Sequence, residues 1–524
     1  MSYLKATYIF GILPFIIIIY NLIPKKREWF LLLANLVFYF LLGRTRVIFL
    51  IISILSIYFS ARIMNKYEDE KEKLLKKKNA DKKLINKRIK NKKKLILVLC
   101  ILLNVSFLVV FKYLGFFAMN INGLFNLLRI NYDIKVMRFI APVGISFYTL
   151  MALSYILDVY NGKIRGEKSF VKVALFLSFF PQIMEGPIAR FSDTADGLSS
   201  GKKVKYSNMV LGYQRIMYGF FKKKLVADRL NALVSTVFNN YASYNGFTIL
   251  MGAIGYTVML YMEFSGTMDV VVGTGQIFGV NIPENFRQPF FSKNVSEFWT
   301  RWHISLGTWF KDYIYYPISL SKPLKKLTLK LRKVFGNHYG PLVSGSIALL
   351  VVWFLNGLWH GAGYTFLFFG MYHFVMIVGG NFLGPVFVKL CGLLHINREH
   401  IVYRVLQSVK MSIFVFIGEM FFRADTVTQG IEMLKGIFTR FSINLNELSS
   451  LGLDLCDYII IIVALIFIFI MSLLKEKGID VRDKLSKKST PIRWAIIYIF
   501  MLSIFIFGAY GPGYEPVDPI YADF

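Results

Sequence analysis

Long apolar runs separated by short basic segments constrain the fold of this chain more than any other feature. Hydrophobic residues make up 55% of its 524 positions, and its mean hydropathy is +0.51. A helix that spans a bilayer needs about 20 mostly apolar residues. Runs of this kind begin near Ile9, Phe30, Val47, Leu95, Phe139, Phe170, Thr248, Leu342, Thr365, Val402, Tyr458 and Trp494. Because lipid offers backbone groups no hydrogen-bond partners, the sequence predicts an all-α polytopic membrane protein.

Two stretches are too short or too polar to be assigned as spanning helices. They cover residues 208–226 and 296–318. We expect interfacial or re-entrant pieces there, which are tolerated where protein or a cavity covers the backbone. No internal repeat and no second soluble region is evident, so residues 1–524 are predicted to form a single membrane domain.

The charge is strongly unbalanced, with 62 Lys and Arg residues against 31 Asp and Glu residues and a net charge of +31. Basic loops between spanning helices remain on the cytoplasmic side. The segments predicted to be cytoplasmic are 25–27, 66–94, 163–168, 222–224, 322–333 and 475–493. This assignment places both chain termini outside the cytoplasm. The tail at 511–524, which has acidic residues but no Lys or Arg, is consistent with it.

The basic segment 66–94 raises the question of nucleic-acid binding. Acidic residues are interspersed in it, and no aromatic residue follows Tyr67 that could stack on bases. A solvated cytoplasmic hairpin near anionic lipid headgroups explains the segment better. We therefore expect the lipid bilayer, and not nucleic acid, as its partner.

Two histidines stand out because an ionisable residue within an apolar membrane segment is a functional-site hypothesis by default. His360 lies in Asn356-Gly-Leu-Trp-His-Gly-Ala, and His303 lies in the aromatic stretch 297–317. His338, His395 and His400 lie beside basic loops and are expected to be surface or structural residues. His373 is predicted to be a hydrogen-bonded core residue.

His360 is flanked by Gly357 and Gly361, which we expect to leave the backbone open to a substrate. Asn356 precedes it by one helical turn on the same face. Asn356 is therefore predicted to fix the imidazole tautomer or to bind a carbonyl oxygen. A structural histidine held in the core is the alternative.

His303 is accompanied by charged side chains that an aromatic interface stripe alone would not explain. Glu297, Arg301, Lys311 and Asp312 share its short stretch, and Arg301 and Asp312 are predicted to support the histidines. A zinc site is disfavoured because no third ligand stands at metal-binding spacing near either histidine. We therefore predict proton-transfer chemistry without a metal.

Several ordered motifs resemble those of the membrane-bound O-acyltransferases, in the bacterial alginate O-acetyltransferase branch. They include Pro142-Val-Gly-Ile-Ser-Phe-Tyr-Thr, Phe179-Phe-Pro-Gln-Ile-Met-Glu-Gly-Pro, Phe264-Ser-Gly-Thr-Met-Asp and Pro283-Glu-Asn-Phe. The stretch 298–317 and Leu358-Trp-His-Gly-Ala are the most diagnostic. Phe179-Phe-Pro-Gln is closer to the acetyltransferase branch than to the D-alanyl-transferring branch.

The resemblance implies a ring of about 11–13 transmembrane helices around a central cavity. It further implies transfer of an acyl group from a cytoplasmic thioester, acetyl-CoA above all, to hydroxyls of an extracytoplasmic cell-wall or secreted polysaccharide. His360 matches the family's invariant histidine and His303 its second one. No bound cofactor is expected. An extracytoplasmic acetyltransferase- or esterase-like partner would complete the transfer.

Further residues are assigned more remote roles. Lys223 and Lys224 are candidates for binding the phosphates of the donor, with membrane orientation as the alternative. Tyr521, in the tail Ile-Tyr-Ala-Asp-Phe, resembles a tyrosine proposed to relay the acyl group, with a frayed terminus as the alternative. Two other functions stay open: D-alanyl transfer to a wall polymer, and a proton-coupled transporter or flippase.

Overall fold

A computed structural model describes residues 5, 7–77, 81–137, 139–511 and 513–517. Helices are the regular structure of these residues, and one isolated β-bridge joins Phe286 to Trp302. The chain divides into two compact units. One contains the described residues of 1–213 and 270–283, and the other contains those of 214–269 and 284–517. Whether the whole chain acts as one domain stays a prediction.

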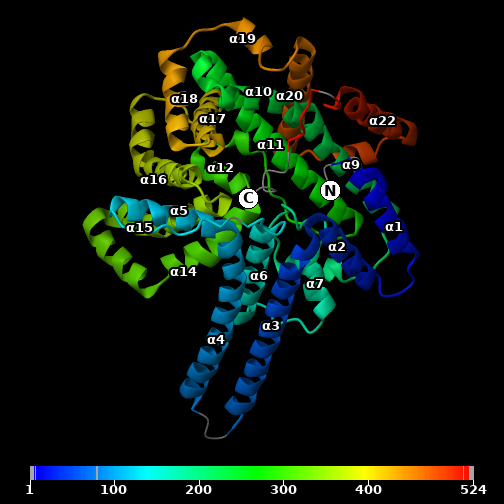
Figure 1. The fold of residues 1–524 in the computed structure, drawn as a ribbon, viewed down its shortest axis with the longest axis vertical. Coiled ribbons are helices and arrows are strands. Elements are labelled where there is room, and N and C mark those ends of the chain that lie inside the picture. The colour runs from blue at the N-terminus through cyan, green and yellow to red at the C-terminus, as the bar shows by residue number, and fades with distance from the viewer. Residues whose placement is uncertain (1–4, 6, 78–80, 138, 512, 518–524) are drawn as a thin grey trace. The chain divides into compact units, whose positions relative to one another are not determined.

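The first unit is built from the N-terminal helices shown from blue to cyan in Figure 1. They are α1 (Leu13–Leu22), α2 (Arg27–Gly43), α3 (Val47–Leu75), α4 (Lys82–Leu108), α5 (Leu114–Leu127), α6 (Ile145–Tyr160), α7 (Phe170–Ser178) and α8 (Phe191–Leu198). α7 is too short to span a bilayer, although an apolar run begins at Phe170. The Phe-Phe-Pro sequence that follows ends the helix, because Pro181 disfavours helical geometry in the residue before it.

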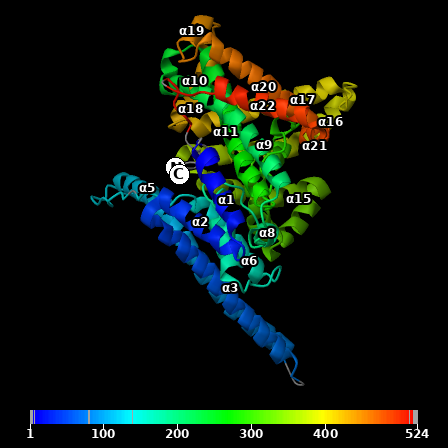
Figure 2. The ribbon, with the colours of Figure 1, turned by 90° about the vertical axis from the view of Figure 1, so that its right-hand side faces the viewer.

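α3 and α4 form a long antiparallel hairpin that extends beyond α2 and α6, as Figures 1 and 2 show. Its far end is the basic segment 66–94. Lys92 pairs with Glu70 at 3.2 Å and Lys93 with Glu68 at 3.1 Å across the two helices. The predicted helical hairpin is therefore confirmed for the described residues, and its acidic residues pair with its lysines.

The second unit contains most of the remaining helices, and α9 and α11 each contribute residues to both units. The helices are α9 (Tyr206–Lys222), α10 (Asp228–Asn239), α11 (Gly246–Ile277), α12 (Val295–Arg301), α13 (Ile304–Phe310), α14 (Tyr316–Ser319), α15 (Lys322–His360), α16 (Tyr364–Leu393), α17 (Ile401–Arg423), α18 (Val427–Thr439), α19 (Leu445–Ser449), α20 (Leu455–Glu476), α21 (Val481–Ser486) and α22 (Thr490–Phe507).

Eight helical segments of the described chain are long and apolar enough to cross a membrane. One of them, Arg27–Leu75, contains both α2 and α3, and Tyr8–Leu22 and Ile145–Tyr160 are shorter apolar helices. The chain is thus an all-α polytopic membrane protein. The arrangement of its helices in a ring stays a prediction.

The stretch 208–226 differs from the expected interfacial piece. α9 continues through a π-helical segment, Lys223–Ala227, directly into α10. Lys222, Lys223 and Lys224 are therefore buried inside a long helix and do not form a cytoplasmic loop. The loop prediction was wrong because Lys222 pairs with the distant Asp269, while Lys223 and Lys224 pair with Asp228 at helical spacing on the same helix.

The stretch 296–318 is broken into short helices, as expected of a re-entrant piece, whereas 322–333 is helical and not a loop. α15 begins at Lys322 and bends at Gly336, whose φ of 75° is non-helical. His338 follows this bend within the helix and is exposed. Only glycine adopts such a φ freely, which explains how one helix changes direction here.

Candidate active site

A break between two helices, α12 and α13, lies at His303. His303 has a φ of 47° and a ψ of 49°, in the left-handed region, which is uncommon for a residue with a side chain. Its side chain belongs to a residue only 3% exposed. The break therefore interrupts the helix at the residue that the sequence singles out.

Asn285 holds this break from a different part of the chain. Its Oδ1 accepts a hydrogen bond from the Ser305 amide at 3.0 Å, and its backbone oxygen accepts one from the Ile304 amide at 3.0 Å. These are amides at the start of α13 that have no partner within the helix. Asn285 thus caps α13 from outside the helix. Asn285 belongs to the motif Pro283-Glu-Asn-Phe, but nothing in the local sequence indicates this capping role.

His360 is the last residue of α15, and the glycines around it have a packing role. A Cβ at Gly357 would lie 2.4 Å from the Phe366 backbone oxygen, and one at Gly361 would lie 2.1 Å from the Phe366 ring. Because both positions lack a side chain, the start of α16 can pack closely against them. The expectation that they leave the backbone open to a substrate was wrong, because Phe366 occupies that space.

The two histidine rings lie 6.5 Å apart, centroid to centroid. Phe264 contacts His303 edge-on at 4.9 Å, and Trp359 lies 5.8 Å from it. Phe422 lies 5.2 Å from the ring of His360, which is 5% exposed. Burial lowers the pKa of His303 to about 3, so its imidazole is neutral near pH 7. The structure therefore brings both predicted histidines into one aromatic-walled site.

Asn356 lies on the last turns of α15 and is 8% exposed. Its Oδ1 is buried and has no hydrogen-bond partner among the described residues. No hydrogen bond joins it to His360 there, so the predicted tautomer-fixing contact is not made in this structure. A buried amide oxygen without a partner is costly, which suits a group that is completed by a substrate.

His373 behaves as the sequence predicts. It is fully buried on α16, and its Nδ1 accepts a hydrogen bond from Trp299 Nε1 at 3.3 Å. Trp299 stands on α12, one turn before the break at His303. This bond therefore fixes α12 against α16.

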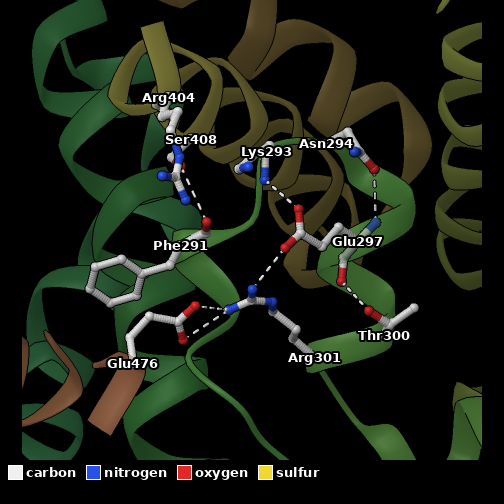
Figure 3. A network of polar contacts seen from close by, with 9 residues as sticks. All are labelled: Phe291, Lys293, Asn294, Glu297, Thr300, Arg301, Arg404, Ser408 and Glu476. Atoms are coloured by element: carbon white, nitrogen blue, oxygen red, sulfur yellow. Dashed lines mark hydrogen bonds and ion pairs between the residues drawn. The ribbon is translucent and has the colours of Figure 1, made fainter. Parts of the chain in front are cut away.

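Arg301 links the same helix, α12, to α20 through ion pairs, as Figure 3 shows. It donates to Glu297 at 2.8 Å and to Glu476 of α20 at 2.9 Å and 3.1 Å. Glu297 also accepts from the Lys293 amide at 2.9 Å. The guanidinium of Arg301 is thus engaged in holding α12 to α20. Asp312 lies farther along, in the half-buried π-helical segment Lys311–Tyr315.

Lys223 and Lys224 are buried and share one carboxylate. Lys224 Nζ donates to Asp228 at 2.6 Å, and Lys223 Nζ lies 3.1 Å from the same carboxylate. Next to them, Arg229 pairs with Asp457 of α20. All five side chains are buried. Donor binding by the two lysines stays a prediction, and the structure gives them other partners.

The segment after α22 packs against this charged network. Lys223 Nζ donates to the Val517 backbone oxygen at 2.6 Å, and Tyr514 donates to Asp457 at 2.7 Å. Lys223 and Val517 therefore cannot face opposite sides of a membrane, as the two loop assignments would require. Tyr521 lies outside the described residues, and its relay role stays a prediction.

Among the described residues, no cluster of three His, Cys, Asp or Glu side chains is arranged to hold a metal ion. What the site offers is two imidazoles, an amide and aromatic walls. A neutral imidazole can accept a proton from a hydroxyl as that hydroxyl attacks an acyl group. The arrangement therefore suits group transfer that proceeds through general-base catalysis.

Comparison with known proteins identifies the family. Residues 163–331 match the model of MBOAT, the membrane-bound O-acyltransferase family. The probable alginate O-acetylase AlgI of Azotobacter vinelandii is 32% identical over 374 residues, which are 70% of this chain and 69% of that protein. The chain therefore belongs to the membrane-bound O-acyltransferase family.

Other relatives act, by their names, on different polymers. The probable alginate O-acetylase AlgI of Pseudomonas aeruginosa is 32% identical over 68% of this chain. The peptidoglycan O-acetyltransferase of Helicobacter pylori is 29% identical over 68% of it. The matched region spans 63% of the Pseudomonas aeruginosa protein's own length.

Proposed function

We propose that this protein is a membrane O-acyltransferase, and specifically an O-acetyltransferase. It would move an acyl group from a cytoplasmic thioester donor such as acetyl-CoA toward hydroxyls of an extracytoplasmic cell-wall or secreted polysaccharide. The observation that carries the proposal is the pair of buried histidine rings 6.5 Å apart, in a chain of this family. The names of the alginate and peptidoglycan relatives support acetyl as the group and a polysaccharide as the destination.

In the reaction we propose, His360 is the general base. A hydroxyl oxygen attacks the thioester carbonyl carbon while the imidazole accepts the hydroxyl proton. The carbon–sulfur bond then breaks, and the thiolate leaves with a proton returned from His360. The aromatic wall limits hydrolysis of the thioester because it excludes water.

His303 and Asn356 have supporting roles in this proposal. His303, held neutral by its surroundings, orients the attacking hydroxyl or the acyl carbonyl. Asn356 supplies an amide that a substrate can engage, since its Oδ1 has no partner in the described structure. Because an amide oxygen accepts hydrogen bonds, this Oδ1 suits a donor of the substrate such as the attacking hydroxyl.

Two further features belong to the proposal. A partner protein of the acetyltransferase or esterase type would complete transfer on the outer side, and Tyr521 would carry the acyl group to it as a phenyl ester. D-alanyl transfer is the second candidate, supported by 30% identity over 46% of this chain to the teichoic acid D-alanyltransferase of Bacillus subtilis.

The testing experiment measures thiol release from acetyl-CoA by the purified full-length protein in lipid nanodiscs, with a polysaccharide fragment supplied as the hydroxyl acceptor. Wild-type protein should release thiol, and His360→Ala should not. His338→Ala, at an exposed histidine of the same helix, is the matched control and should behave as wild type. A wild-type protein that hydrolyses or transfers no thioester of any acyl group would favour the transporter.

A further inference from the structure

A cavity of about 1040 Å³ lies in the second unit among α9, α11, α20 and α22. It is at the upper end of the size of small-molecule sites, about 300–1,000 Å³. Neither His303 nor His360 is among its lining residues. The cavity is therefore distinct from the histidine site.

Most of the cavity wall is apolar. Phe221 and Leu225 line it from the α9 side, Val463 and Phe467 from α20, and Phe500 from α22. The lining along α20 extends from Ile459 to Lys475. At 1.5 Å per residue this is about 24 Å, most of the hydrocarbon thickness of a bilayer, about 30 Å. A ligand that fills the cavity along this wall is therefore long and apolar.

Three aromatic rings of the wall pack against one another midway along the cavity. Phe221 stacks on Phe500 at 5.0 Å and contacts Phe467 at 5.2 Å. Beyond them, the Arg229–Asp457 pair fixes the start of α20 to α10.

One end of the cavity carries charged side chains. The acidic side chains at this end are already paired with cationic ones. Arg215 donates to Asp269 at 3.0 Å and to Glu284 at 2.5 Å. Lys222 donates to Asp269 at 2.7 Å. Burial alone would raise the pKa of Glu284, but its hydrogen bonds with Arg215 hold that pKa below its ordinary value. Both acids are thus balanced by cations within the wall.

Lys475 and Arg482 add positive charge at this end. Lys475 makes no ion pair within the described part of the chain, while its neighbour Glu476 is bonded to Arg301. Asp480 caps α21 and accepts from the amides of residues 482 and 483. The connecting segment 475–493 contains seven Lys or Arg residues against three acidic ones. This end of the cavity therefore favours an anionic group.

We propose that the cavity binds an anionic phospholipid, with its acyl chains along α20 and its phosphate at Lys475 and Arg482. Basic pockets between transmembrane helices bind anionic headgroups, and basic segments beside a spanning helix attract them. The site is independent of the proposed acyl transfer. Its test is a binding measurement that needs no activity.

The test uses the full-length protein in phosphatidylcholine vesicles that contain a trace of photoactivatable phosphatidylglycerol. The lipid carries a diazirine in one acyl chain, and labelled peptides are identified by mass spectrometry. The same diazirine on phosphatidylcholine is the reference lipid. Residues 459–471 and 496–507 should be labelled by phosphatidylglycerol about tenfold more than by the reference lipid, given two basic side chains at the headgroup.

Variants separate headgroup selection from simple filling of a crevice. The double variant Lys475→Glu, Arg482→Glu should abolish the preference for phosphatidylglycerol. The matched control Lys484→Glu, Lys488→Glu, on the same segment but outside the lining, should retain it. Ala464→Trp should reduce labelling by both lipids. Equal labelling by the two lipids, equal losses in the two double variants, or labelling elsewhere in the chain would each overturn the proposal.

Discussion

Two buried polar clusters of the second unit differ in how their polar groups are satisfied. In the cluster around Asp228, each cationic side chain faces a carboxylate, and Arg229 pairs with Asp457. In the histidine site, aromatic rings surround His303 and His360, and Asn356 keeps a buried amide oxygen without a partner among the described residues.

The difference separates a structural role from a chemical one. Paired charges in a low-dielectric interior are strongly destabilising when one member is removed, so the Asp228 cluster fixes α10, α20 and the segment after α22. A neutral imidazole can accept a proton from a substrate, so the histidine site is where our proposal places the chemistry. The predictions below set changes in one cluster against changes in the other.

The largest effect on stability is expected from Asp228→Ala. The change leaves two buried ammonium groups without their carboxylate, and breaking a buried pair costs about 3–5 kcal/mol. Thermal unfolding in detergent measures it. The control is Asp483→Ala, which removes an exposed pair with Lys487 and should cost less than about 1 kcal/mol. Similar unfolding temperatures for the two variants would contradict the structural role.

His303→Ala should lower the rate of acyl transfer about 10²–10⁴-fold, the range of acid–base groups. Its unfolding temperature should stay much closer to wild type than that of Asp228→Ala. Steady-state transfer rates on monodisperse protein provide the measurement. An active His303→Ala variant would confine catalysis to His360.

Asn285→Ala should have a smaller effect that passes through His303. Loss of a helix cap costs about 0.5–2 kcal/mol, and the loosened α13 should lower kcat more than it changes KM for the donor. In a His303→Ala background the same change should lower kcat no further. Asn294→Ala is the matched control, because Asn294 caps α12 through the Glu297 amide at 2.8 Å. Equal losses in both backgrounds would show that Asn285 does not act through His303.

A further effect is expected in the acid dependence of stability. The pKa of His303 is lowered by burial from its ordinary 6.5 to about 3, so below pH 6.5 the unfolded state binds a proton that the folded state does not. The stability from neutral His303 is therefore present above pH 6.5 and lost progressively as pH falls toward 3. Between pH 7 and pH 5, wild type should lose more stability than His303→Asn. If the stability of the two proteins changed with pH in the same way, His303 would be more exposed to water than the structure shows.

Much of this account can be predicted from sequence because its signals are local. Apolar runs mark the spanning helices, and an ionisable residue inside an apolar segment marks His303 and His360. Even the end of α7 is signalled by Pro181. What could not be predicted depends on contacts between distant segments.

The sequence predictions that were wrong or incomplete involve such contacts. Lys222 suggests a basic loop until Asp269, from a distant part of the chain, is placed beside it. Gly357 suggests an open backbone until Phe366 packs on it. Asn285 reveals its role only when the start of α13 lies against it. Arg301 suggests support for catalysis, whereas its described bonds hold α12 to α20.

The most direct test of the central claim compares His360→Ala with Asp228→Asn in one assay. Acyl-transfer rates are divided by the amount of folded protein, measured by size-exclusion chromatography at a temperature where both variants are folded. We predict that His360→Ala loses at least about a hundredfold in rate per folded molecule, while Asp228→Asn keeps a rate near wild type on a less stable fold. A His360→Ala variant that transfers acyl groups at the wild-type rate would contradict the claim.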